Sequence, residues 1–495
     1  MKIPRAVRES GILFVFGALA PFALAPYDIW PLAIVSLAAL CYYITEKTTN
    51  SVYFSAVCFN LGLFLSGVSW LYISIHEHGF VAAPLALIAT LLFCAFLAVV
   101  SSLPFFAWSL VPQNRSWTLL AFPALWVLGE WLRSWLLTGF PWLFVGYSHL
   151  STWVGGWAPI GGIFWLSFIT AMAAACGAHA LQGSTRSLVW RRCTAAIAVL
   201  IVSGYPLQHI RWTQLDGPEL SVTLIQPNIP QGEKWSARSQ RIILEKMNAQ
   251  SLTHWGQDLI VWPEAAIPAV PQRIPAFLEE LKRRALKSNT TLITGIPTFD
   301  DKTNQFYNSL LSIGANSAQY NKTRLVPFGE YVPLEDTLRG VMSFFDLPMS
   351  NFVRGAAEQP LLRIDDRGIA TAICYEVVYP DLVARMSKGA SFMLTVSNDT
   401  WFGDSLALPQ HLQMAQMRAL ENAKPLVRAT NNGLTALVDH KGKVTGSIPA
   451  FAAGELAGKI QPRKGQTVFS MWGSWPCISL CVAIMAGLWR TKTKA

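Results

Sequence analysis

Charged residues are scarce in this chain: 14% of its 495 residues are Asp, Glu, Lys or Arg, whereas 52% are hydrophobic. This balance excludes an ordinary soluble protein and indicates several membrane spans. The sequence also lacks a Gly-x-Gly-x-x-Gly run and a Walker sequence. It therefore gives no indication of nucleotide use, and we expect no cofactor.

The net charge of +10 is concentrated outside the one long polar region. Residues 217–470 carry 26 Lys or Arg and 23 Asp or Glu, a net charge of +3, and the hydrophobic segments with their short loops carry the other +7. A basic surface suited to nucleic acid is therefore not expected on the polar region.

Eight apolar segments are candidates for membrane spans, because a bilayer core of about 30 Å is crossed by roughly 20 helical residues. They lie near residues 10–26, 29–45, 53–74, 80–112, 117–137, 157–182, 193–210 and 471–489. We expect the first to be a retained span, since no small-residue cleavage site follows it. The sequence thus predicts a membrane domain over residues 1–212 with seven helices, a soluble domain over 217–468, and an eighth helix over 470–490.

Basic residues choose the orientation of these spans. One set of loops and both termini carry Lys2, Arg5, Arg8, Lys47, Arg115, Arg186, Arg191, Arg192, Arg490, Lys492 and Lys494. The opposite loops, 26–28, 75–79 and 139–153, contain no Lys or Arg. The positive-inside rule places the basic side in the cytoplasm, so the soluble domain is predicted to lie on the outer side.

The soluble domain has the pattern of an α/β fold. Short β-branched runs predict strands near 221–226, 258–262, 291–295, 308–313, 369–373, 392–396, 426–430 and 435–438, with helices over 274–287 and 411–423. Glu264, Lys322 and Cys374 each follow a predicted strand or its connecting turn. Such strand ends commonly converge on one crevice.

Cys374 is the only one of eight cysteines in the soluble domain, so it cannot form a disulfide within that domain. An inert buried cysteine is the simpler interpretation, because free cysteine is among the most buried residue types.

The local sequences around these three residues favour a catalytic interpretation. Glu264 in Trp262-Pro-Glu, Lys322 in Tyr320-Asn-Lys and Cys374 in Cys374-Tyr-Glu376 resemble the Glu-Lys-Cys triad of the nitrilase, or carbon-nitrogen hydrolase, superfamily. The narrower resemblance is to the apolipoprotein N-acyltransferase family. It rests on Asn321-Lys-Thr-Arg-Leu-Val-Pro-Phe-Gly-Glu-Tyr-Val-Pro333, Ser397-Asn-Asp-Thr-Trp-Phe-Gly403 and Asn431-Asn-Gly433, with similar patterns at 70–79 and 139–147.

The resemblance implies a multi-span α-helical membrane domain in the bacterial inner membrane and an α-β-β-α sandwich in the periplasm. It also implies transfer of an acyl chain from a phospholipid, phosphatidylethanolamine, to the amine of a diacylglyceryl-cysteine apolipoprotein by a monomeric enzyme. A thiolate suits that exchange, because a thioester divides it into two easier steps.

Roles for individual residues follow from the resemblance. Cys374 is expected to be the nucleophile, Lys322 to stabilise the oxyanion, and Glu264 to act as the base, favoured if partial burial raises its pKa. Each could instead be an ordinary buried or surface residue. Supporting roles are implied for Glu330, Tyr375 and Glu376, and substrate contacts for Trp235, Trp401, Asn308, Tyr331 and Pro333; the two tryptophans could equally be packing residues.

Two charged or titratable clusters outside the triad allow other interpretations. Glu130 and Arg133 in the fifth segment could form a buried pair or could snorkel to the interface. His76 and His78 flank Glu77, but their spacing is short for zinc, and we expect no metal. Two other functions remain open: a membrane-tethered amidase whose thioester is discharged by water, and a transporter or scaffold whose soluble domain only binds a partner.

Overall fold

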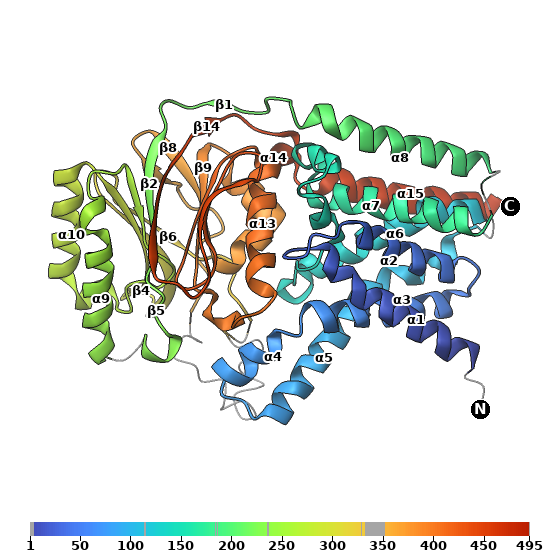
Figure 1. Cartoon of the computed structure of the whole chain (residues 1–495), viewed down its shortest axis with the longest axis horizontal. Helices are drawn as coiled ribbons and strands as arrows, with labels where there is room; N and C mark the ends of the chain where they lie inside the picture. The colour runs from blue at the N-terminus through green and yellow to red at the C-terminus, as the bar shows by residue number, and fades with distance from the viewer. Residues whose placement is uncertain are drawn as a thin grey trace. The chain divides into compact units, whose positions relative to one another are not determined.

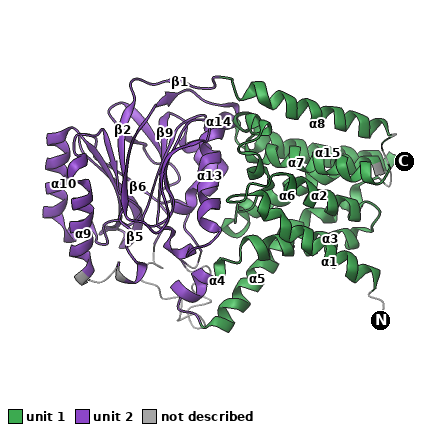
Figure 2. Ribbon diagram, viewed as in Figure 1, with its two compact units in different colours: residues 1–72, 82–210, 472–495 green, residues 73–81, 211–471 purple. Residues whose placement is uncertain are grey.

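The computed structural model describes residues 4–112, 115–183, 185, 187–234, 237–327, 329–331 and 352–494. The chain forms two compact units (Figure 2). Residues 1–72, 82–210 and 472–495 form the first, called here the helical unit. Residues 73–81 and 211–471 form the second, called here the sandwich unit.

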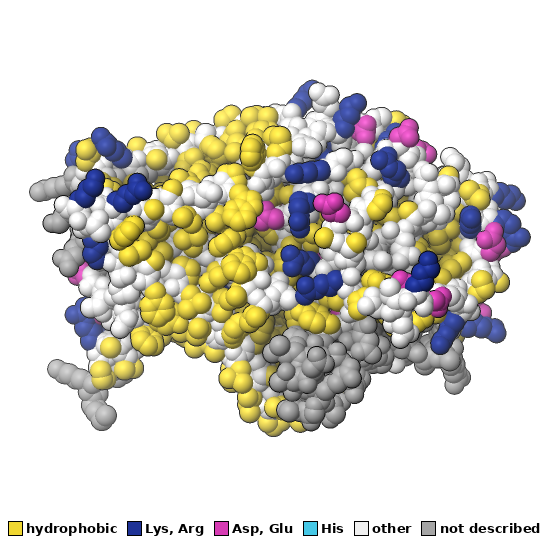
Figure 3. All heavy atoms as spheres, turned by 180° about the vertical axis from the view of Figure 1, so that it is seen from behind, with side chains coloured by type: hydrophobic (Ala, Val, Ile, Leu, Met, Phe, Trp, Pro, Cys, Tyr) yellow, Lys and Arg dark blue, Asp and Glu magenta, His cyan; other side chains and the backbone are white. Residues whose placement is uncertain are grey.

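The helical unit contains a helix in each of the eight apolar segments of the sequence. On the outer surface of α5, Leu85, Leu87, Ile88, Leu91 and Leu92 are exposed, and apolar side chains dominate the face of this unit at the left of Figure 3. An apolar exterior on a helical bundle is typical of contact with lipid. The eight helices are α1 (Arg5–Leu19), α2 (Pro31–Ile44), α3 (Thr49–Gly67), α5 (Ala83–Ser102), α6 (Thr118–Trp135), α7 (Ala158–Leu181), α8 (Leu188–Leu207) and α15 (Trp475–Lys494).

Length and composition single out fewer than eight spans. Within the described residues, four helical stretches are long and apolar enough to cross a membrane: Arg5–Ala23, Ala83–Leu110, Trp153–Leu181 and Leu188–Leu207. The bent pair Thr49–Gly67 and Leu71–His78 makes a fifth if it is a single span. The chain therefore has the helices of a membrane protein, and eight crossings stay a prediction.

Glu130 and Arg133 of α6 are each only 3% exposed, and both are bonded to the loop that follows their helix. Arg133 Nη1 donates to the carbonyl oxygens of Phe140 (2.9 Å) and Trp142, and the backbone N–H of Val145 donates to Glu130 Oε1 (2.9 Å). Since both charges are buried in protein, the snorkelling interpretation is wrong. The two residues fix an irregular loop inside the helical unit.

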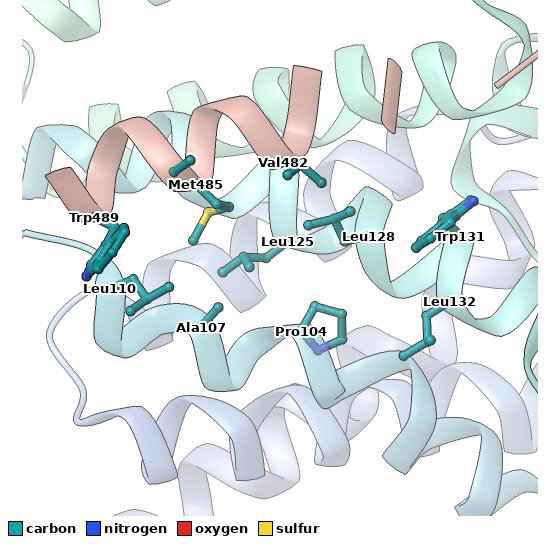
Figure 4. Close-up of a pocket in the computed structure, with 11 residues that line it drawn as sticks. Pro104, Ala107, Leu110, Leu125, Leu128, Trp131, Leu132, Val482, Met485 and Trp489 are labelled. Carbon is teal, nitrogen blue, oxygen red and sulfur yellow. The ribbon is translucent and has the colours of Figure 1, made fainter. Parts of the chain in front are cut away.

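An apolar cavity of about 400 Å³ lies between the segment 103–110, α6 and α15 (Figure 4). Leu125, Leu128 and Leu132 line it from α6, and Val482 and Met485 line it from α15. The described residues around it include no ionisable side chain, so it is no candidate for acid-base or nucleophilic chemistry.

The sandwich unit is built on two six-stranded sheets. In both sheets three central strands are parallel and the outer ones antiparallel. The first has the order β13 (Gly454–Ile460), β2 (Leu220–Gln226), β3 (Leu259–Val261), β4 (Thr291–Asp300), β5 (Gln305–Ile313), β6 (Ala318–Asn321). The second has the order β12 (Val444–Ile448), β11 (Thr435–Val438), β10 (Leu426–Thr430), β9 (Ala390–Ser397), β8 (Arg367–Ile373), β7 (Leu362–Ile364).

The two sheets pack face to face, with helices on their outer sides (Figure 1). Val222 and Val261 of the first sheet share a core with Ile369 and Phe392 of the second. A separate core joins the first sheet to α9 (Ala237–Ser251) and α10 (Pro275–Ser288), whereas α12 (Pro380–Met386) and α13 (Ala407–Asn422) contact the second sheet. The predicted α-β-β-α sandwich is confirmed.

The eight predicted strands are present as β2, β3, β4, β5, β8, β9, β10 and β11. Sequence reasoning missed β6, β7, β12 and β13, together with a short antiparallel pair, β1 (Gln214–Leu215) and β14 (Arg463–Lys464). Glu455 and Lys459 explain one omission, because β13 lies at a sheet edge and exposes alternate residues, so its sequence carries glycine and charge.

Candidate active site

Glu264 lies in the turn that leaves β3. The turn passes so close to Gly295 of β4 that a Cβ at Gly295 would be 2.4 Å from Ala265 N and 2.7 Å from Glu264 Cα. Backbone hydrogen bonds join the two segments, from Gly295 N to Pro263 O (3.2 Å) and from Ile267 N to Gly295 O (3.1 Å). Glycine at position 295 therefore allows the turn to bring a 6% exposed carboxylate to this edge of the sheet.

Lys322 follows β6 and joins two carboxylates in a buried cluster. Its Nζ atom lies 3.3 Å from Glu264 Oε1 and 2.9 Å from the Glu330 carboxylate, and the lysine is only 1% exposed. Asn308 Nδ2 donates to Glu264 (2.8 Å) and to Glu330 (2.7 Å). Asn308 therefore holds the two carboxylates together, and its predicted substrate contact stays a prediction.

The cluster sets the charge state of Glu264. Burial pushes the pKa of Glu264 upward, but Lys322, the Asn308 amide and the backbone N–H of Asn398 together hold it below its usual value. A raised pKa, the condition that would favour Glu264 as a base, is therefore not found, because the charge and hydrogen-bond partners of Glu264 outweigh its burial. An ionised Glu264 is ready to accept a proton.

Lys322 remains protonated for a related reason. Burial lowers the pKa of Lys322, but the fields of Glu264 and Glu330 outweigh burial and raise it above its usual value. A fixed ammonium group is thus available to stabilise negative charge that develops nearby.

Cys374 follows β8 and has a left-handed backbone conformation, with φ of +52°. Non-glycine residues rarely adopt this conformation, and it is found where surrounding structure enforces it, often at functional sites. The residue is partly exposed. Burial of its sulfur and the nearby Glu264 carboxylate raise the pKa of the thiol, although Lys322 opposes them. The resting sulfur is therefore protonated and needs a proton acceptor before it can attack.

The two residues after Cys374 connect it to the rest of the sandwich. Glu376 accepts hydrogen bonds from Ile373 N (2.8 Å), Thr323 N (2.6 Å) and Tyr320 Oη (3.0 Å), so it ties the end of β8 to the segment that carries Lys322. The ring of Tyr375 packs edge-on against Tyr379, with centroids 5.3 Å apart. The supporting role of Glu376 stays a prediction.

The remaining predicted substrate contacts fall in different places. Trp235 and Pro333 lie outside the described residues. The Tyr331 ring stacks on the Arg354 guanidinium at 5.5 Å. Trp401 is held by segment 73–81, because Ser74 Oγ donates to its carbonyl oxygen (2.6 Å) and the His78 ring lies 5.7 Å from its own ring.

Lys234 is a member of the site that sequence reasoning missed. Its Nζ atom donates to the backbone oxygen of Glu264 (3.1 Å), and the side chain is 1% exposed. Burial lowers the pKa of Lys234 to about 8, although the Glu264 carboxylate opposes the change. In the sequence, Lys234 stands out only because it precedes Trp235, a predicted substrate contact.

Asp399, His411 and Arg428 were also missed. They are fully buried and bonded to one another near Cys374, although they come from three separate elements. Ser397-Asn-Asp399 was noted only as a matching motif. Among the described residues, no group of three or more His, Cys, Asp or Glu side chains is placed to hold a metal ion.

Comparison with known proteins agrees with the two-unit organisation. The family model of the apolipoprotein N-acyltransferase N-terminal domain matches residues 16–176, and that of carbon-nitrogen hydrolase matches residues 221–468. In solved structures, Nit3 of Saccharomyces cerevisiae, a member of branch 10 of the nitrilase superfamily, is similar with a TM-score of 0.38 and 16% identity over 51% of this chain and 93% of that one.

Curated relatives match nearly the whole chain. The apolipoprotein N-acyltransferase of Pseudomonas syringae pv. tomato is 41% identical over 481 residues, which covers 94% of each chain. That of Vibrio parahaemolyticus is 38% identical over 506 residues, which covers 99% of this chain and 98% of the relative. With such identity across both units, this chain belongs to the apolipoprotein N-acyltransferase family.

Proposed function

We propose that this protein transfers an acyl chain from a phospholipid to the α-amine of a diacylglyceryl-cysteine apolipoprotein, through a thioester on Cys374. One observation carries the proposal: Lys322 is buried between Glu264 and Glu330, and the Cys374 thiol lies in the electrostatic field of this cluster. The family supplies the substrates, since its members are named apolipoprotein N-acyltransferases.

The first step forms the acyl-enzyme. Cys374 Sγ attacks the ester carbonyl carbon of the phospholipid, its proton passes to Glu264, and the carbonyl oxygen becomes an oxyanion stabilised by Lys322. Collapse of this intermediate breaks the ester C–O bond. The departing glycerol oxygen takes the proton back from Glu264 and leaves as a lysophospholipid.

The second step delivers the acyl group. The neutral α-amine of the acceptor attacks the thioester carbonyl carbon, and Glu264 takes a proton from its nitrogen. The C–S bond breaks, an amide bond remains on the acceptor, and the sulfur regains its proton from Glu264. Alternating use of one thiol by two substrates predicts ping-pong kinetics.

The resting charges suit this sequence of proton transfers. Glu264 is ionised and Cys374 is protonated, so the base can accept the proton that the nucleophile must lose. Glu330 and Asn308 keep Lys322 and Glu264 in register. We assign them positioning roles, because their contacts are to other side chains of the cluster.

The membrane setting is part of the proposal. We infer that residues 1–212 and 470–490 span the bacterial inner membrane and that residues 217–468 lie in the periplasm, because the basic loops fall on one side of the predicted spans. A phospholipid donor, phosphatidylethanolamine, then reaches the site from the surrounding bilayer. The apolar exterior of the helical unit supports this placement.

The proposal is tested by product formation in vesicles. Purified full-length protein is reconstituted with phosphatidylethanolamine and a diacylglyceryl-cysteine peptide, and the N-acylated peptide is followed by mass spectrometry. We expect product from the wild type and from Cys193→Ala, a control thiol in α8, and none from Cys374→Ala. Product at the normal rate from Cys374→Ala, or none from the wild type, would refute the proposal.

A further inference from the structure

The segment Ser397–Asp399 at the end of β9 contacts both the base and the nucleophile. The backbone N–H of Asn398 donates to Glu264 Oε2 at 2.8 Å. Burial raises the pKa of the Cys374 thiol, and the neighbouring Ser397 side chain opposes that rise. Ser397 and Asn398, adjacent at the end of β9, therefore lie beside the thiol and the carboxylate that exchange a proton in the proposed mechanism.

Asp399 anchors this segment through three buried contacts. Its Oδ2 atom accepts a hydrogen bond from Arg428 Nη2 (2.7 Å), and its Oδ1 atom lies 3.1 Å from His411 Nδ1 and accepts a hydrogen bond from the Ser397 hydroxyl. None of these side chains is more than 1% exposed. Buried charges are costly and are retained only when well paired, so the cluster fixes the Asp399 carboxylate in one place.

A glycine makes room for that carboxylate. A Cβ atom at Gly433 would lie 2.2 Å from Asp399 Oδ2. Asn431, from the same loop, donates through its backbone N–H to Ser397 O (3.0 Å) and through its side chain to Asn398 Oδ1 (3.0 Å). The run Asn431-Asn-Gly433, which sequence analysis noted without a role, thus packs around Ser397–Asp399.

The same cluster reaches the backbone of the nucleophile. Burial lowers the pKa of His411, and the neighbouring backbone of Cys374, whose φ of +52° needs support from its surroundings, opposes that change. Asp399 and Arg428 in turn hold His411, with Arg428 Nη2 3.1 Å from His411 Nδ1. The anchor therefore lies beside both the side chain and the main chain of Cys374.

The geometry points to Asp399 as a positioning residue for acyl transfer, which keeps the Asn398 N–H on Glu264 and the Ser397 side chain beside the Cys374 thiol, with Gly433 as the residue that admits its carboxylate. This inference rests on the proposed function and adds to it residues that act through others. Arg428 and His411 fix Asp399 and are not placed at the reacting atoms.

A buried ion pair can also serve stability alone, and the chain offers a matched control for that case. Arg418 and Glu421 of α13 form an equally buried pair at 2.8 Å. In the part of the chain that the structure describes, Arg418 Nη2 donates to Glu421 Oε1 (3.0 Å), so the two side chains pair within one helix. Glu421→Gln therefore removes a comparable charge without disturbing the site.

The experiment compares acyl-adduct formation on Cys374 in four variants of the full-length protein in phosphatidylethanolamine vesicles. Asp399→Asn removes the anchoring charge, Gly433→Ala displaces the carboxylate with every charge retained, and Ser397→Ala removes the hydroxyl while leaving the Asp399–Arg428 pair intact. Glu421→Gln is the control. Rates are measured from pH 5 to pH 10 and normalised to the folded fraction.

We expect Asp399→Asn and Gly433→Ala to slow adduct formation by about 10- to 100-fold, because displacement of reacting groups by about 1 Å costs this much. In a plot of rate against pH, the low-pH limb, along which Glu264 ionises, should move to higher pH in both variants. The reason is that a loosened Asn398 no longer lowers the pKa of Glu264. Lys322, Glu330, Lys234 and Cys374 also face Glu264 and are unchanged in these variants. Ser397→Ala should be slower than wild type, and Glu421→Gln should keep the wild-type rate and pH profile.

Each outcome decides one claim. If the wild type forms no adduct, the proposed function fails. If the wild type reacts, the positioning role is wrong under either of two results. One is that folded Asp399→Asn or Gly433→Ala forms the adduct within twofold of the wild-type rate. The other is that the low-pH limb of its pH–rate profile does not move. Should neither of these variants fold, Ser397→Ala decides, and a rate within twofold of wild type overturns the inference.

Discussion

Replacement of Lys322 by methionine tests the electrostatics of the site most fully. The substitution keeps an unbranched side chain and removes the ammonium group that lies 3.3 Å from Glu264 and 2.9 Å from Glu330. At an effective dielectric constant of about 20, each of these attractions is worth about 5 kcal/mol. Two buried carboxylates would then share Asn308 with no cation between them.

The substitution should change both the protonation of Glu264 in the resting enzyme and the stability of the transition state. Without Lys322, burial and the charge of Glu330 raise the pKa of Glu264, so the acidic limb of adduct formation should move up by at least about two pH units. Loss of the oxyanion partner adds a rate decrease of about 10²- to 10³-fold even where Glu264 is ionised.

The assay follows the mass of the acyl adduct on the intact protein from pH 5 to pH 10, with thermal unfolding as a check of folding. Lys282→Met, in which an exposed lysine of α10 is changed, is the matched control and should behave as wild type. The account of the site would be refuted if folded Lys322→Met formed the adduct within threefold of the wild-type rate at pH 7. It would also be refuted if the low-pH limb of the pH–rate profile did not move.

Three further predictions concern backbone space, a buried amine and the membrane loop. Gly295→Ala should slow adduct formation by about 100-fold, because the added Cβ displaces Glu264. The control Gly458→Ala, whose Cβ meets only the end of the Leu437 side chain, should keep the wild-type rate. Equal rates for the two variants would contradict the argument from close approach at Gly295. Lys234→Met should raise the unfolding free energy by about 3 kcal/mol at pH 7, because the pKa of Lys234 is about 8 when folded and about 10.4 when unfolded. This gain should shrink as pH rises from about 8 to about 10, where the wild-type lysine loses its charge in both states; a pH-independent difference in denaturant titrations would disprove it. Arg133→Met removes two carbonyl contacts in the helical unit and should cost about 3 kcal/mol, seen as a lower unfolding midpoint in detergent; an unchanged midpoint would show that the loop needs no such anchor.

Local patterns located most of the sandwich and the three central site residues. β-branched and apolar runs predicted the buried strands, such as β9, because every residue there is buried and most of them are apolar. Edge strands such as β13 escaped, because half of their residues face solvent. Glu264, Lys322 and Cys374 were found because each follows a strand within a recognisable local sequence.

Contacts between distant segments could not be predicted from local sequence. The lowered pKa of Glu264 depends on Lys322, Asn308 and Asn398, whose approach to it is fixed only by the fold. Asp399 and Gly433 are likewise separated by 34 positions, and nothing in either local sequence shows that one makes room for the other. Sequence reasoning therefore singled out Glu264, Lys322 and Cys374 as candidates, but it could not show which partners set the charge of Glu264.

The central claim is that Cys374 carries the acyl group between two substrates. Intact-protein mass spectrometry of the full-length enzyme, first with phosphatidylethanolamine alone and then after addition of a diacylglyceryl-cysteine peptide, tests it directly. We predict one acyl adduct on Cys374 that is stable in buffer and is discharged by the peptide with formation of one N-acylated peptide. No adduct, an adduct on another residue, or discharge by buffer as fast as by the peptide would contradict the account.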